Sequence, residues 1–137
     1  MPSTASRLIC TPPGHIHDVW MHAKGRIKCA IEQTGLSDFA DVEADVLRGG
    51  QLLWLAWNGE TIEAAATTQI TTVGAKRVCV LTACAGEHRE RWLPLFSHIE
   101  RYAKGERCSI MRVFGRRGWE RVLDGYEVTN VVLEKEL

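Results

Sequence analysis

The chain has 137 residues, 45% hydrophobic and 25% charged. This size and composition fit one globular domain over residues 1–137 and exclude two independently folding domains. Basic and acidic side chains each number 17, so no net charge draws nucleic acid or a membrane to the molecule as a whole. Residues 1–75 hold five basic and eight acidic side chains, whereas residues 76–137 hold twelve and nine. Any anionic partner would therefore bind a local basic patch in the second half of the chain.

Segments that would direct the chain to a membrane are not predicted. Residues 1–10 contain one basic residue and no apolar run of the ~7–15 residues that a signal peptide needs, so a cytoplasmic location is expected. The longest apolar run, 52–57, is far shorter than the ~20 residues that cross a bilayer. The five cysteines include no Cys-x-x-Cys pair, which favours reduced, mostly buried thiols and no metal site.

The first half of the chain predicts one strand and two helices. Leu8–Cys10 is a candidate first strand, and the Pro-Gly break at 11–14 ends it. Apolar residues then recur at helical spacing from Asp18 until Gly35. Ser37 is the expected N-cap of a second helix, which ends at Gly49 and Gly50.

The middle of the chain changes to strand periodicity. Two antiparallel strands, 52–57 and 61–73, are expected around the Asn58-Gly59 hairpin signal. Residues 77–84 are apolar on both faces, which predicts a central strand covered by helices on each side. A loop over 85–91 and a helix from Trp92 to Gly105 follow.

The remaining residues predict a strand at 108–114, a turn at 115–118, a short helical segment at 119–123 and a last strand, Tyr126–Leu133. The whole order of elements predicts a chain of the broad α/β class, and within it the α+β type. It would form one domain with a mixed, mostly antiparallel central sheet and helices on both faces.

This order resembles the GNAT (Gcn5-related N-acetyltransferase) superfamily from about Asp18 onward. The hairpin 53–59 followed by Ile62-Glu63-Ala64-Ala65-Ala66 is similar to the family's paired strands with a small-residue stretch. The segment 115–126 followed by 131–135 looks like the family's last helix, glycine-aromatic corner and final strand. The likeness is greatest to short GNAT-like proteins of tailed bacteriophages and prophages.

The resemblance implies a site for acetyl-CoA and transfer of its acyl group to an amine. In the family, the loop after the central strand holds the pyrophosphate, helped by helix N-terminal amides and by glycine. A backbone amide of the central strand would stabilise the oxyanion. The implied cofactor-binding residues here lie in that strand, loop and helix start, namely Leu81, Cys84, Ala85, Gly86, Arg89 and Arg91. The implied acid and base are Tyr126 and Glu63.

Three departures from the family pattern keep a second function open. Glu87 and Glu90 place negative charge near the expected phosphates, and Pro94 removes an amide donor. Arg121 stands where many members have a tyrosine general acid. The alternative is a catalytically silent GNAT-fold protein of phage or prophage type with a structural or virion-associated role, whose partner would be a phage structural protein.

Other groupings of chemically active residues favour less specific interpretations. Cys84 lies four residues before His88, but no third residue to orient a nucleophile is identifiable. Asp18 and His22 share one helical face near His15 and His17, with no matching ligand pair further along the chain. The basic segment Arg101–Arg121 would suit a CoA phosphate, an acidic protein or, as a weaker alternative, a nucleic-acid backbone. An oligomer is compatible with the sequence.

Overall fold

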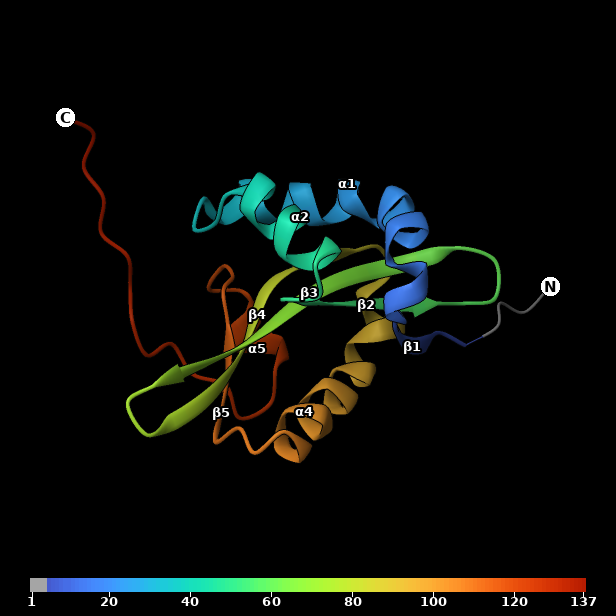
Figure 1. Ribbon diagram of the computed structural model, residues 1–137. Coiled ribbons are helices and arrows are strands. Elements are labelled where there is room, and N and C mark those ends of the chain that lie inside the picture. Colours follow the sequence, from blue (N-terminus) through green and yellow to red (C-terminus); the bar gives the residue numbers. More distant parts are fainter. Residues whose placement is uncertain (1–4) are drawn as a thin grey trace.

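The computed structural model describes residues 5–137, which build a five-stranded sheet between two layers of helices (Figure 1). The strands lie side by side in chain order. They are β1 (Arg7–Cys10), β2 (Leu52–Trp57), β3 (Ile62–Val73), β4 (Lys76–Gly86) and β5 (Ile110–Val113). The first three pairings are antiparallel, and β4 pairs with β5 in parallel. The predicted fold class is confirmed.

One face of the sheet is covered by α1 (Ile16–Thr34) and α2 (Phe39–Leu47), after a 3-10 turn, η1 (Pro13–His15). The predicted Ser37 cap was wrong by one residue, because the Asp38 carboxylate accepts the Asp41 N–H at 3.2 Å. Within residues 5–137, no helix combines the length and hydropathy needed to cross a membrane.

The other face is covered by α4 (Phe96–Gly105) and the short α5 (Trp119–Val122). The single helix predicted over 92–105 is in fact three pieces, α3 (Arg89–Trp92), η2 (Leu93–Leu95) and α4. The break coincides with Pro94, which lacks the N–H that a continuous helix needs.

Successive side chains of a strand point to opposite faces of the sheet, so the strands pack against both helical layers. Leu53 and Leu55 pack with α1 and α2, whereas Trp54 packs on the α4 side. In β4, Leu81 belongs to the α4 side and Ala83 to the α1 side, so this strand is buried on both faces as predicted. It is the fourth strand of the sheet, between β3 and β5.

The predicted hairpin between β2 and β3 is confirmed, with residues 58–61 as its loop. The Asn58 side-chain oxygen accepts the N–H groups of Glu60 and Thr61, each at 2.8 Å. Gly59 supplies the positive φ of +98° that this turn requires.

The predicted last strand, Tyr126–Leu133, was wrong. Residues 126–133 are described but belong to no strand, and the chain extends away from the sheet toward the C-terminus (Figure 1). Val131 and Leu133 are 66% and 89% exposed. The β-branched composition predicted a strand, but a strand forms only where a neighbouring strand satisfies its backbone groups, and residues 126–133 pair with none in the described chain.

Candidate functional site

The most distinctive feature of the sheet is that β4 extends beyond the end of its pairing with β5. Pairing between them ends at Leu81 and Val113, followed by a 3.1 Å hydrogen bond from Phe114 N to Leu81 O. Beyond that point β4 continues to Gly86, paired only with β3. The sheet therefore opens on the β5 side of residues 82–86.

The direction of the backbone groups at this opening follows from the register. Glu87 N donates to Glu63 O at 2.9 Å, so residue 87 turns its amide toward β3. Successive residues of a strand direct their amides to opposite sides. Cys84 and Gly86 therefore direct their backbone N–H and C=O groups toward the side that β5 does not reach.

A β-bulge fixes where this opening begins. Thr67 pairs with Ala83 and Thr68 with Leu81, which leaves Thr82 as an extra residue in β4. The Thr82 hydroxyl donates to Gln51 Oε1 at 2.7 Å and lies 2.6 Å from the Thr67 hydroxyl. Because Thr82 has one hydroxyl proton, Thr67 is the donor in their contact. Three buried polar side chains thus hold the bulge in place.

The loop after β4 leads directly into α3. His88 has a left-handed φ of 56°, and Arg91 N donates to its carbonyl at 2.8 Å. Arg89 and Glu90 form the exposed first turn. Gly86 is required by packing, since a Cβ there would lie 2.4 Å from Ala64 Cβ and 2.5 Å from Glu63 O.

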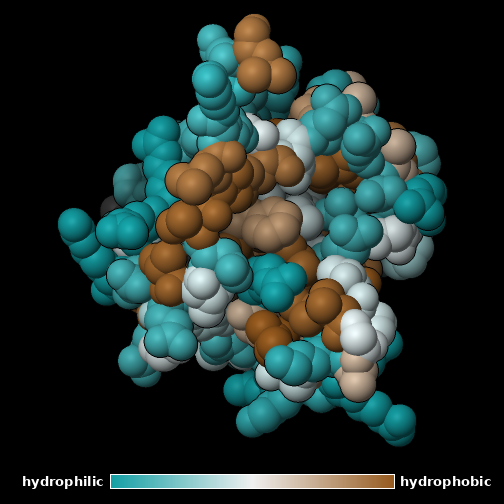
Figure 2. All heavy atoms as spheres, turned by 90° about the vertical axis from the view of Figure 1, so that its left-hand side faces the viewer, coloured by the Kyte–Doolittle hydropathy of each residue, from teal (hydrophilic) through white to brown (hydrophobic). Residues whose placement is uncertain are grey.

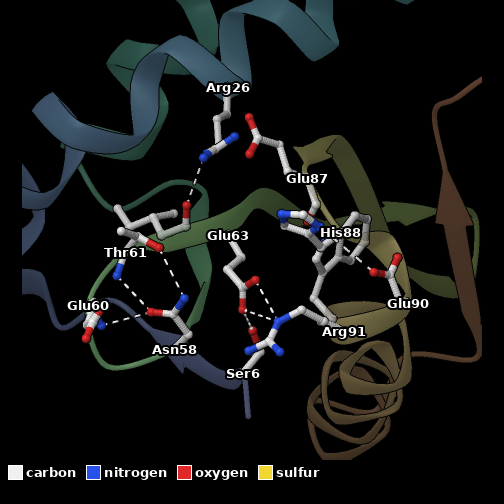
Figure 3. A network of polar contacts seen from close by, with 12 residues as sticks. Ser6, Arg26, Asn58, Glu60, Thr61, Glu63, Glu87, His88, Glu90 and Arg91 are labelled. Carbon is white, nitrogen blue, oxygen red and sulfur yellow. Dashed lines mark hydrogen bonds and ion pairs between the residues drawn. The ribbon is translucent and has the colours of Figure 1, made fainter. Parts of the chain in front are cut away.

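The predicted base, Glu63, is buried at 6% exposure in a polar network (Figure 3). Its two carboxylate oxygens share the single Nε–H of Arg91, at 2.7 and 2.9 Å, and the carboxylate also accepts a hydrogen bond from the Ser6 hydroxyl. The Ser6 hydrogen bond first, and then Arg91, lower the pKa of Glu63 below its ordinary value. A carboxylate so stabilised is a weak proton acceptor.

This network borders a cleft of about 440 Å³ at the end of the sheet where the β2–β3 loop, α1 and the start of α3 meet (Figure 3). Arg26 of α1 donates to Ile62 O there at 2.8 Å. The side chains around the cleft are mostly charged or polar, namely Arg26, Asn58, Thr61, Ile62, Glu63, Glu87, His88 and Arg91.

The predicted acid, Tyr126, lies on the α4 side with different partners. Its hydroxyl donates to Glu100 Oε2 at 2.7 Å, and its ring packs edge-on against Phe96 with centroids 5.8 Å apart. Burial first, and the Glu100 carboxylate next, raise the pKa of Tyr126 above its ordinary value. Tyr126 and Cys84 border the same apolar cluster, whereas Glu63 is tied to Ser6 and Arg91.

The predicted cofactor-binding residues are brought to one end of β4 and the start of α3, but they are engaged differently. Leu81 is fully buried, and Cys84 and Ala85 are half-buried. Burial raises the pKa of the Cys84 thiol to about 12, which disfavours a nucleophilic thiolate. Arg91 pairs with Glu63, and Arg89 is exposed in the first turn of α3.

Two groups of residues that position this site were missed in the sequence. Ser6 lies 57 residues from Glu63, and Gln51 lies 31 residues from Thr82. No local pattern marks such long-range polar pairs, or a bulge. Within residues 5–137, no group of three or more His, Cys, Asp or Glu side chains is arranged to hold a metal ion.

The sequence matches no family model and no curated protein, but the structure is similar to solved acetyltransferases. An aminoglycoside acetyltransferase from an uncultured soil metagenomic sample, solved with trehalose, has a TM-score of 0.70, 9% identity and 96% coverage of both chains. The same enzyme was also solved with sisomicin. A predicted acetyltransferase from Clostridium acetobutylicum, solved with acetyl-CoA, has a TM-score of 0.67, 12% identity and 96% coverage of both chains.

A GNAT family acetyltransferase from Staphylococcus aureus has a TM-score of 0.64 and 12% identity, covering 98% of this chain and 100% of its own. This chain has the GNAT fold. At these identities the likeness shows the fold alone, so function has to be argued from the site.

Proposed function

We propose that this GNAT-fold chain binds an acyl-CoA thioester along the open side of β4 and transfers the acyl group to an amine. The observation that carries the proposal is that β4 runs past β5, so that Cys84 and Gly86 offer backbone donors and acceptors to a ligand. An amide-containing chain such as the pantetheine arm of CoA pairs with such an edge as an extra strand does.

The residues present fit the two ends of CoA unequally. The opening beside Cys84 and Gly86 suits the pantetheine arm, and the Cys84 N–H is the candidate donor to the thioester oxygen. At the phosphate end, Arg89 supplies an exposed positive charge, but Glu87 and Glu90 lie beside it. Arg89 is therefore the proposed phosphate contact. Arg91, which is paired with Glu63, is proposed to contribute only by holding the start of α3 in place.

In the proposed reaction the amine forms a bond to the acyl carbon, and the carbon–sulfur bond breaks with its electron pair leaving on the CoA sulfur. The resulting thiolate takes up a proton from solvent, and the amine gives up a proton. The acid and base predicted from the resemblance, Tyr126 and Glu63, both hold structural hydrogen bonds. We propose that water takes the amine proton. An aminoglycoside is the first amine to test, since one similar enzyme was solved with sisomicin.

The deciding experiment is thermal unfolding with acetyl-CoA, coupled to an assay of acetyl transfer to sisomicin and to simple polyamines. Binding at 100 times the dissociation constant stabilises the folded state by about 2.7 kcal/mol. Arg89→Glu should weaken binding about tenfold or more, whereas Lys76→Glu, the same charge change at the opposite end of β4, should not. The absence of any shift in midpoint with acetyl-CoA would overturn the proposal.

A second candidate is a non-catalytic protein on the same fold, such as the phage structural component suggested by the sequence. It is favoured by one observation, that Glu63, Arg91 and Tyr126 are all held in structural contacts. Binding of acetyl-CoA without transfer to any amine tested would support this candidate over the first.

A further inference from the structure

The cleft at the end of the sheet, between α1, the β2–β3 loop and the start of α3, has no part in the proposed function. Its volume of about 440 Å³ is within the range of about 300–1,000 Å³ that is usual for small-molecule sites. Ile62 is the one apolar residue among the described residues around it. Figure 2 shows the opposite end of the molecule, where brown apolar groups lie among teal polar ones. The cleft, by contrast, is suited to a small polar ligand.

Two of the charges around the cleft neutralise each other. Glu63 is 6% exposed, and its carboxylate lies 2.7 Å from Arg91 Nε. Because this pair is closed within the protein, it presents no net charge to a ligand. The other charged side chains around the cleft are Arg26 and Glu87, with the imidazole of His88 beside them.

Arg26 is half-buried, and no carboxylate of the described chain neutralises it. Its guanidinium donates to Ile62 O at 2.8 Å, which fixes the position of the side chain at the cleft. A guanidinium has five N–H donors, and this bond engages one of them. A partly dehydrated cation gains more from a counter-charge than a cation in bulk water does. Arg26 therefore favours an anionic group in the cleft.

Glu87 supplies the opposite charge. Its backbone is held in place, because its N–H donates to Glu63 O at 2.9 Å and its carbonyl accepts from Trp92 Nε1 at 2.8 Å. In Figure 3 the side chains of Arg26 and Glu87 point toward one another, from α1 and from the end of β4. Among residues 5–137, however, neither side chain forms an ion pair. A cation and an anion that face each other without pairing suit a ligand that carries both charges.

We propose that this cleft binds a free α-amino acid, with its carboxylate on Arg26 and its ammonium group on Glu87. Both charged groups of an α-amino acid are attached to one carbon, so one small molecule bridges the two side chains. The planar guanidinium also matches the two oxygens of a carboxylate. Asn58 and Thr61 border the same cleft with polar side chains, which favours an amino acid with a short polar side chain, such as serine. The proposal does not depend on the proposed function.

The test is titration of the full chain with L-serine, without acetyl-CoA, followed by the NMR shifts of backbone amides. The expected dissociation constant is about 10 mM or lower, with the largest shifts at residues around the cleft. L-Serinamide lacks the carboxylate, and N-acetyl-L-serine lacks the ammonium group. Each should bind at least about tenfold more weakly than L-serine, because each leaves one charged side chain without its partner.

Arg26→Gln and Glu87→Gln should each weaken the binding of L-serine about tenfold or more. Glu87→Gln keeps both backbone bonds of residue 87, so its thermal unfolding should match that of the unmodified chain. In this variant L-serine and N-acetyl-L-serine should bind with similar affinity, since the ammonium group has lost its partner.

The matched controls are Lys28→Gln on α1 and Glu90→Gln in the first turn of α3. They remove the same charges at exposed positions that do not line the cleft, and they should leave the binding of L-serine unchanged. The absence of shifts around the cleft at up to about 100 mM L-serine would overturn the proposal. So would equal binding of L-serine and either analogue by the unmodified chain, because only one charge would then be recognised. Unchanged binding of L-serine by Glu87→Gln would contradict the proposed ammonium contact.

Discussion

Gln51 accepts a 2.7 Å hydrogen bond from Thr82 and thereby ties the junction between α2 and β2 to the bulge of β4. The direction of the Gln51 amide is set by a second bond, from its nitrogen to Asp45 at 3.3 Å. A side chain 31 residues away therefore fixes the point at which β4 separates from β5.

Thr82→Val should destabilise the fold by about 2 kcal/mol, because it leaves the buried Gln51 oxygen and Thr67 hydroxyl without their partner. Urea unfolding measures this loss. Thr72→Val makes the same change at an exposed position of β3 and should stay within about 0.5 kcal/mol of the unmodified chain. Equal effects of the two substitutions would show that the polar network does not hold the bulge.

Glu63→Gln should lower the free energy of unfolding at neutral pH. In acid, the difference between this variant and the unmodified chain should disappear. Ser6 and Arg91 lower the pKa of Glu63 from its ordinary value of 4.5, so folding favours its charged form. That contribution is present above pH 4.5 and is lost as pH falls through the lower folded-state pKa. Urea midpoints measured from neutral to acidic pH should therefore converge for the two chains. Glu60→Gln, at an exposed site, should show no such convergence.

Gly86→Ala should destabilise the fold by about 1–3 kcal/mol, because the added methyl group meets Ala64 and the Glu63 carbonyl. Gly118→Ala is the matched control, since a Cβ there has nothing within 4 Å and φ is −57°. Thermal unfolding without ligand distinguishes the two. If Gly86→Ala changed ligand affinity but not stability, the glycine would serve the ligand rather than strand packing.

The Cys84 thiol should resist alkylation in the folded chain. With a pKa of about 12, the thiolate fraction at pH 8 is on the order of 10⁻⁴. Mass spectrometry after treatment with iodoacetamide should find the exposed Cys29 modified first, and Cys84 only after unfolding in urea. Fast modification of Cys84 would restore the nucleophilic interpretation.

Tyr126→Phe should cost about 1 kcal/mol of stability by removing the bond to Glu100. A general acid contributes about 10²–10⁴-fold to a rate, so a merely structural tyrosine leaves acetyl transfer within a few-fold. Glu100→Gln, alone and combined with Tyr126→Phe, completes a double-mutant cycle on stability. A drop in transfer of a hundredfold with unchanged stability would make Tyr126 the acid.

Most of the sheet and both helical layers were predictable, because burial on one or two faces of an element produces a periodic pattern of apolar residues in the sequence. The apolar residues on both faces of β4 reflect its contacts with both helical layers, and the helical spacing of apolar residues in α1 reflects its contact with the sheet. The last strand was predicted on the same grounds and was wrong, because residues 126–133 have the composition of a strand but pair with no strand of the described chain.

The candidate site was predictable only in its location. The sequence placed Cys84, Gly86 and Arg89 at the end of a buried strand and the start of a helix, and the structure places them there. Their chemistry depends on partners that no spacing predicts. Ser6 and Arg91 hold Glu63 as a low-pKa carboxylate, and Glu100 holds the Tyr126 hydroxyl.

By itself, then, the sequence determined the elements and their order, because hydrophobic periodicity and turn residues act over a few neighbouring positions. The tertiary structure alone decided where β4 separates from β5, which charges neutralise each other, and which strand-like segment remains uncovered. Those outcomes rest on contacts between residues tens of positions apart, such as Thr82 with Gln51 and Glu63 with Ser6, and on sheet edges that exist only once the chain has folded.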